Sequence, residues 1–182
     1  MYTGTNPSAL RSRNEIVPAF FNLLSDYSFE EITIKQIMDA TGLSRQTFYQ
    51  IFTDKEEILE YYLDTLFGEF MTHVKQYEVK NLCHAAKIFF AFFQEYKEIF
   101  SLIIKNGKSG VLQRKCSEYL QKSEYIRYDL HGVESDWDRE YATTFVISGM
   151  VSMLEKWILS PESEKQGATE LAKLVCRITG TD

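Results

Sequence analysis

The chain has 182 residues, 45% of them hydrophobic and 14% aromatic, which is enough apolar material to bury a sizeable core in one large or two small domains. Its net charge of −6 argues against a protein that coats nucleic acid through bulk positive charge. No apolar run approaches the roughly 20 residues of a membrane span, and the N-terminus lacks a secretory signal, so we expect a cytoplasmic protein without a membrane partner.

The three cysteines, Cys83, Cys116 and Cys176, are odd in number and far apart in the sequence. Their spacing predicts neither a disulfide framework nor a metal-binding cluster, so we expect reduced thiols. The histidines are equally scattered, and the adjacent Cys83 and His84 would diverge by about 100° on a helix. We therefore expect no metal and no cofactor.

Apolar residues recur at spacings of three and four nearly throughout, while the chain has only three prolines and nine glycines, which predicts an all-α fold. The first helix should begin at Asn6, with Pro7 in the first helical position. Pro18 should bend this helix because it removes the hydrogen bond to the carbonyl of Asn14.

Two short helices should follow, joined by a tight turn. Thr33 and Gln36 form a capping box that opens the first of them, and Gly42 can end it in the left-handed conformation. Ser44 can cap the second short helix. Thr53 should form another capping box, with Glu56, and open a long helix.

The long helix should end near Tyr77, and four more helices should follow it. Their expected ranges are 81–105 with a break near Tyr96, 109–129, 136–159 and 162–179. These elements suggest an N-terminal domain over 1–52 and a larger helical domain over 53–182.

The stretch TGLSRQTFYQIF, residues 41–52, contains the candidate functional helix. At 100° per residue Ile51 and Phe52 fall within about 60° of Phe48, whereas Gln46 and Gln50 point to the opposite side. Two short helices with a Gly-containing turn, preceded by a third helix, are typical of a helix-turn-helix DNA-binding unit.

The outward side chains suit base recognition. Glutamine amides pair with adenine, the methyl group of Thr47 suits a thymine methyl, and the hydroxyl of Tyr49 reaches a phosphate or a base. Arg45 suits a guanine or a phosphate. Thr33, Ser44 and Lys55 lie at helix N-termini, where phosphate binds favourably.

Residues 12–60 resemble the N-terminal domain of the TetR/AcrR-like family of bacterial transcriptional regulators. Ser44-Arg45, Thr47-Phe48-Tyr49, Phe52 and Lys55 are the most specific elements of this resemblance. It implies DNA contacts by Thr33, Ser44, Arg45, Gln46, Thr47, Tyr49, Gln50 and Lys55.

The larger domain carries most of the aromatic residues, including FFAFF at 89–93. The resemblance implies that this region dimerises and binds a small-molecule effector, whose binding residues stay unknown. The stretch 141–159 is apolar around most of its circumference, so with the last helix it predicts a dimer interface.

We therefore predict a homodimeric transcriptional regulator, a repressor that binds a palindromic operator in double-stranded DNA. A small-molecule effector is expected to release it. No glycine-rich phosphate loop or nucleophile elbow is present, so we expect no enzyme.

Two alternatives stay open. One is a protein-interaction adaptor of the same fold, supported by the seven acidic against five basic residues in 1–56. The other is a small-molecule-binding helical protein or enzyme that works through its aromatic body alone.

Overall fold

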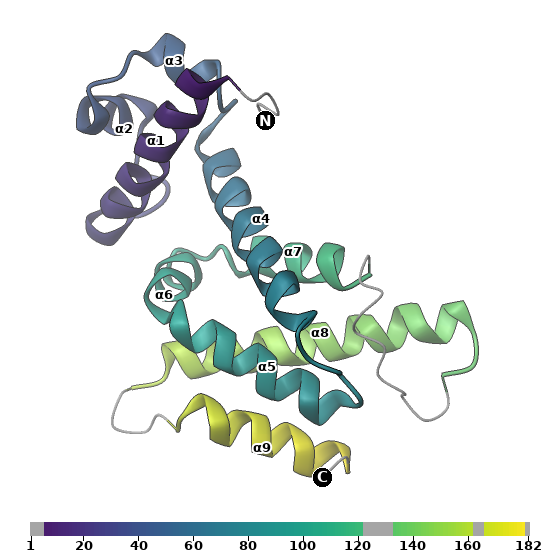
Figure 1. Cartoon of the computed structure of the whole chain (residues 1–182). Coiled ribbons are helices and arrows are strands. Elements are labelled where there is room, and N and C mark those ends of the chain that lie inside the picture. The colour runs from purple at the N-terminus through teal and green to yellow at the C-terminus, as the bar shows by residue number, and fades with distance from the viewer. Residues whose placement is uncertain (1–5, 122–132, 162–165, 181–182) are drawn as a thin grey trace. The chain divides into compact units, whose positions relative to one another are not determined.

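A computed structural model of the chain describes residues 6–121, 133–161 and 166–180, and over these ranges it contains nine helices and no strand (Figure 1). The predicted all-α fold is confirmed. The chain forms two compact units, Met1–Thr65 and Leu66–Asp182. The helices are α1 Pro7–Asp26, α2 Ile34–Thr41, α3 Arg45–Tyr49, α4 Lys55–Val74, α5 Leu82–Glu95, α6 Lys97–Lys105, α7 Ser109–Gln121, α8 Asp136–Leu159 and α9 Ala168–Thr179.

The first unit begins as the sequence predicts. Asn6 caps α1 by accepting a hydrogen bond from the backbone N–H of Ser8 at 3.0 Å, and Pro7 takes the first helical position. Pro18 lies inside α1, where it has no N–H to offer. Helix α1 turns an apolar face inward, and the ring of its Phe20 meets that of Phe29 edge-on at 6.0 Å.

Local side-chain caps set the boundaries of α2. The backbone N–H of Gln36 donates to the hydroxyl of Thr33 at 3.2 Å, and the Gln36 side chain accepts from the Thr33 N–H at 2.8 Å. The predicted capping box is therefore confirmed. Gly42 ends α2 with a φ of 70°, the left-handed conformation expected of it.

The cap of α4 differs by one residue from the prediction. The N–H of Glu57 donates to Oδ1 of Asp54 at 2.9 Å, and the N–H of Thr53 donates to Glu57 at 2.6 Å. The predicted partner, Glu56, has no part in these two bonds. The predicted box was wrong: Asp54 accepts from the first turn of α4, and the Glu57 carboxylate reaches back to the N–H of Thr53.

The second unit contains α5 to α9 and the C-terminal part of α4. The predicted break at Tyr96 separates α5 from α6, and α8 has the predicted bounds. Helix α7 is described up to Gln121, so part of its predicted range lies outside the described residues. Helix α9 starts at Ala168; of its predicted beginning, 162–165 also lie outside the described residues.

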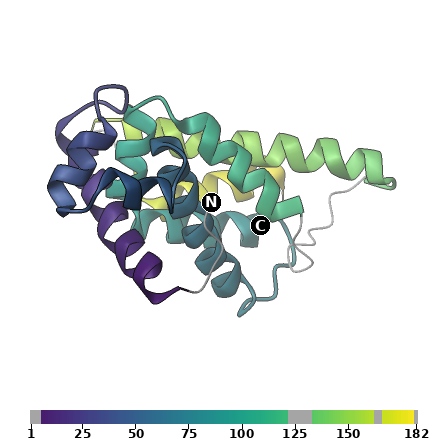
Figure 2. The same ribbon diagram turned by 90° about the horizontal axis from the view of Figure 1, so that it is seen from above.

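Helix α8 meets the length and composition of a membrane span, which no other helix in the described ranges does. One side of it packs into the second unit through Val146, Met150 and Leu154. Its N-terminal half extends past the ends of α5 and α9 in both views (Figures 1 and 2). Core helices commonly share this composition, so it is not evidence of a span.

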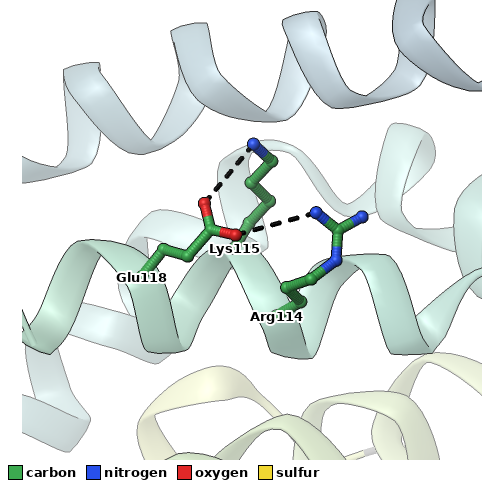
Figure 3. Close-up of polar contacts among 3 residues, drawn as sticks. All are labelled: Arg114, Lys115 and Glu118. Carbon is green, nitrogen blue, oxygen red and sulfur yellow. Dashed lines mark ion pairs between the residues drawn. The ribbon is translucent and has the colours of Figure 1, made fainter.

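Helix α7 places a charged side chain in the interior of the second unit. Lys115 is buried, and its ammonium lies 3.5 Å from the carboxylate of Glu118 (Figure 3). The other carboxylate oxygen of Glu118 lies 3.6 Å from Arg114. Buried charges need partners, and the i, i+3 spacing on α7 supplies one to Lys115.

Cys83 and Cys176 are joined by a disulfide that links α5 to α9. The prediction of three unpaired, reduced thiols was therefore wrong for these two residues. They are 93 residues apart, and only the packing of α5 against α9 brings them together. Cys116 is a free buried thiol, and its burial raises its pKa.

The left-handed conformation at Gly42 gives a direct test of the turn between α2 and α3. A Cβ at this position meets no atom within 4 Å, so the penalty for Gly42→Ala is conformational. We expect a loss of about 1 kcal/mol in the free energy of unfolding, measured by urea denaturation. Gly68→Ala is the control, because Gly68 lies inside α4 with equally open space. There alanine should stabilise by about 0.5–1 kcal/mol, and equal effects at the two sites would contradict the assignment.

Candidate nucleic-acid interface

Helix α3 is short, and its inner side packs into the core of the first unit. Phe48, Ile51 and Phe52 are at most 3% exposed, as predicted. The ring of Phe52 lies 5.9 Å from that of Phe48 and 6.0 Å from that of Tyr61 on α4. These contacts attach α3 to the core of the first unit.

The helix ends earlier than expected. The sequence predicts that Ile51 and Phe52 belong to this helix, but α3 ends at Tyr49. A tight turn follows, in which two N–H groups share one carbonyl. The N–H groups of Ile51 and Phe52 both donate to the carbonyl of Phe48 at 2.8 Å. The turn still directs both side chains inward, so the buried face is the predicted one.

The outer face of α3 is polar and accessible. Arg45, Gln46, Tyr49 and Gln50 are exposed, and Tyr49 is 60% exposed. The ring of Tyr49 stands edge-on to Phe48 at 5.4 Å, which orients the phenol without burying it. Two amides, a guanidinium and a phenol are thus available to a partner on one small surface.

The hydroxyls at the helix N-termini already have local partners. Thr33 donates its hydroxyl to Oε1 of Gln36 at 2.7 Å, and its N–H donates to the same oxygen. A threonine has one hydroxyl proton, so in this arrangement Thr33 offers no donor to a phosphate. The backbone N–H groups of Ile34 and Lys35, in the first turn of α2, have no intrahelical acceptor and are the better donors there.

Ser44 and Thr47 form a similar local pair. The N–H of Thr47 donates to the hydroxyl of Ser44 at 3.0 Å, and the two hydroxyl oxygens lie 2.8 Å apart. Ser44 thus caps α3 as predicted, and Thr47 is half-buried. Both side chains fix the start of α3.

Lys55 lies in a cage of backbone carbonyls. Its ammonium donates to the carbonyls of Phe29 at 2.5 Å, Ile32 at 2.8 Å and Glu30 at 3.1 Å. It also lies 4.7 Å from the centre of the Phe29 ring. A lysine has three N–H donors, and all three are used here. A contact with phosphate would break one of these bonds, so the geometry favours a positioning role: Lys55 attaches the turn between α1 and α2 to the start of α4.

The second unit contains an apolar cavity of about 30 Å³. Its walls come from α4, α5, α7 and α8, and include Phe70, Phe89, Leu120, Ile147 and Met150. The sequence named no ligand-binding residue, because apolar periodicity alone does not distinguish a cavity wall from a filled core. Among the described residues, no group of three or more His, Cys, Asp or Glu side chains forms a metal site.

The carbonyl cage predicts a structural effect for Lys55→Met, which keeps the length of the side chain and removes the ammonium. We expect about 2 kcal/mol of lost stability, since hydrogen bonds to charged groups are strong and three carbonyls lose their donor. Faster hydrogen exchange at the amides of residues 28–34 would report it. Lys35→Met is the matched control: Lys35 is exposed, and its loss should cost no more than about 0.5 kcal/mol. Similar effects of the two variants would refute the cage.

Residues 16–62 match the sequence model of bacterial regulatory proteins of the tetR family. A stretch of 62 residues is 31% identical to the HTH-type dhaKLM operon transcriptional activator DhaS of Lactococcus lactis subsp. lactis (strain IL1403). That match covers 34% of this chain and only 33% of DhaS.

Solved structures show similarity over most of the chain. A TetR transcriptional regulator from Streptococcus agalactiae 2603V has a TM-score of 0.70 at 17% identity, over 94% of this chain and 95% of that one. A dihydroxyacetone kinase operon activator, DhaS, has a TM-score of 0.59 at 17% identity, over 92% and 93%. Residues 16–62 thus carry the sequence pattern of the tetR family, and the fold over most of the chain is similar to that of these two regulators.

Proposed function

We propose that the chain is a DNA-binding transcriptional regulator that places α3 in the major groove of its operator. The observation that supports this proposal is that α3 has one buried apolar side and one exposed polar side. Phe48, Ile51 and Phe52 fasten one side to the core, while the other side exposes recognition side chains within the segment that matches the tetR family. A helix whose buried side is packed into the core can present its exposed side chains to base edges in a fixed register.

Each exposed side chain then has a role. The amides of Gln46 and Gln50 read adenine, Arg45 reads guanine or binds phosphate, and Tyr49 contacts a phosphate or a base. Phosphate binds at the first turns of α2 and α3, whose geometry Thr33, Ser44 and Thr47 fix through their caps. Lys55 positions the turn that precedes α2.

The regulator acts as a homodimer in this proposal. On α8, Trp137, Tyr141 and Phe145 are 65%, 59% and 81% exposed and follow one another at intervals of four residues. On α9, Leu174 and Ile178 are also exposed. Exposed apolar side chains in rows of this kind favour association, and a second copy of the chain fits a palindromic operator.

The sign of regulation depends on where the operator lies relative to the promoter. The sequence predicts a repressor, whereas the similar protein from Lactococcus lactis is named an activator. We retain repression as the expectation, and a promoter fused to a reporter gene tests it directly in cells with and without this chain.

An effector would act through the second unit. A ligand that binds more tightly to a state with misplaced recognition helices weakens operator binding by that difference in affinity. The cavity has room by volume for about one or two water molecules but no polar partner for them, so it stays dry. An effector of several heavy atoms must therefore widen it, and the neighbouring helices would have to separate.

The proposal is tested by selecting bound fragments from the DNA of the source organism and measuring affinity for the selected site against salt. Sequence-specific binding that weakens with salt supports a regulator. Binding to no fragment would refute it, and would favour the protein-interaction adaptor that the acidic balance of residues 1–56 supports.

Tyr49→Ala tests the exposed face of α3. We expect a loss of about 1 to 3 kcal/mol in the free energy of operator binding, measured by fluorescence anisotropy, with little change in folding. Tyr27→Ala is the matched control, because Tyr27 belongs to the same unit, is 47% exposed and lies outside α3. Loss of binding in both variants, or in neither, would mean that the contact face lies elsewhere.

Phe145→Asp tests the dimer. A charge in place of the 81% exposed ring should raise the dissociation constant of the dimer by about 30-fold or more, as expected of a central aromatic contact. Sedimentation equilibrium measures this constant. Tyr77→Asp is the control, because Tyr77 is 48% exposed, follows α4 and belongs to neither α8 nor α9. A dimer that withstands Phe145→Asp places the interface on another surface.

A further inference from the structure

The disulfide lies near the C-terminal end of α9, and each end of this helix is bonded to the rest of the second unit. Cys83 is the second residue of α5, and Cys176 lies in the last turn of α9, so the two helices run antiparallel (Figure 1). At the other end, the indole of Trp157 donates to the carbonyl of Gln166, just before α9 begins. Loss of the disulfide leaves the start of α9 attached and removes the covalent link at its end.

The fully buried side chains of α9 are small, and Leu171 is half-buried beside them. The buried residues are Ala168, Ala172, Val175 and Cys176. Small side chains bury little apolar surface, and apolar burial is what holds a short amphipathic helix in place. The covalent link therefore adds to the packing that attaches α9 to α5, and it does so at the end of α9.

The disulfide also fixes the direction of the outer face of α9. Leu174 and Ile178 stand two residues to either side of Cys176, so each points about 160° away from it. Both are exposed, while Cys176 is 1% exposed. Fixing Cys176 against α5 thus fixes where these two apolar side chains point.

We propose that Cys83 and Cys176 are a reversible thiol–disulfide pair that controls the attachment of α9. The sequence predicts a cytoplasmic protein, and disulfides in such proteins are usually transient or redox-sensing. Oxidation joins the two sulfurs and fixes α9 against α5. Reduction frees its last turn and the direction of Leu174 and Ile178.

The exchange needs only a low-molecular-weight thiol and its disulfide. In the oxidising direction, the two cysteines lose two protons and two electrons to a small disulfide, which leaves as two thiols. In the reducing direction, a small thiolate attacks the sulfur of Cys176 and Cys83 leaves as a thiolate; a second small thiolate then attacks the sulfur of the first, so that Cys176 leaves as a thiolate and a small disulfide forms. The first turn of α5 favours the negative charge on Cys83.

Burial makes this exchange depend on local opening. The two cysteines are 2% and 1% exposed, so a thiol reaches the bond only when the end of α9 opens. Terminal turns open most easily, and Cys176 lies three residues before the end of α9. Cys116 is an internal reference: it is equally buried, lies inside α7 and has no disulfide partner.

The first test counts thiols in the full-length protein after equilibration in buffers with different ratios of a small thiol to its disulfide. We expect one thiol per chain in oxidising buffers and three in reducing buffers, with a reversible transition between them. Three thiols in every buffer would refute the pair, and one thiol in every buffer would refute its reversibility.

The second test measures amide hydrogen exchange by mass spectrometry. Exchange in residues 174–179 should be about tenfold faster in the reduced protein than in the oxidised one. Cys83→Ser/Cys176→Ser should match the reduced protein in every buffer, and Cys116→Ser should follow the wild type. In the reduced wild-type protein the disulfide is absent without any substitution. Equal hydrogen exchange in the oxidised and reduced wild-type protein would therefore refute the proposal that the disulfide controls the attachment of α9.

The expected effect of the disulfide on dimerisation rests on the homodimer proposed above. It is measured in a separate experiment. The dissociation constant of the dimer should differ between the oxidised and reduced proteins, and not for the double serine variant. A monomer in both forms would refute the homodimer, while the thiol counts and the exchange of α9 would still decide the thiol–disulfide pair.

Discussion

The anchoring of α3 by three buried side chains is the constraint on which the candidate DNA-binding surface depends. A five-residue helix contains little more than one turn, and forming one turn costs more than its hydrogen bonds return. Phe48, Ile51 and Phe52 supply the missing stabilisation by packing into the first unit, and Ser44 satisfies the first turn. Because this inner side holds the helix, the outer side needs no packing role and can consist of groups suited to recognition.

The elements that could be predicted from sequence are those fixed by short-range contacts. Thr33 with Gln36, Gly42, and Ser44 all act within three or four residues, so spacing reveals them. The start of α4 was missed by one residue because Thr53 and Asp54 are both good caps with a glutamate three residues later. The tertiary packing of the first unit decides which of these two residues caps α4. The end of α3 was missed for a related reason, since caps mark where a helix starts and tertiary contacts decide where this one ends.

Long-range contacts gave no local signal. Lys55 matches a lysine that the family resemblance assigned to DNA, yet its ammonium binds carbonyls 23 to 26 residues earlier in the chain. Cys83 and Cys176 are still further apart and looked like unrelated thiols. In both cases the partner depends on which elements pack together, and residue type and spacing do not reveal this. Candidate sites inferred from single residues are therefore less predictable than the helices that carry them.

The carbonyl cage around Lys55 limits how the proposed operator affinity could arise. With Lys55 used inside the first unit, Lys35 on α2 and Arg45 on α3 are the basic side chains that these two helices can direct at phosphate. The salt dependence of DNA binding grows with the number of phosphates neutralised, so two such groups per copy give a shallow dependence. The chain carries a net charge of −6, which opposes non-specific attraction as well. In the complex that we propose, base contacts through Gln46, Tyr49 and Gln50, and phosphate contacts to uncharged backbone N–H groups, would then supply most of the affinity. If the proposed function is correct, such a regulator has weak general attraction to DNA and depends on discrimination at its operator.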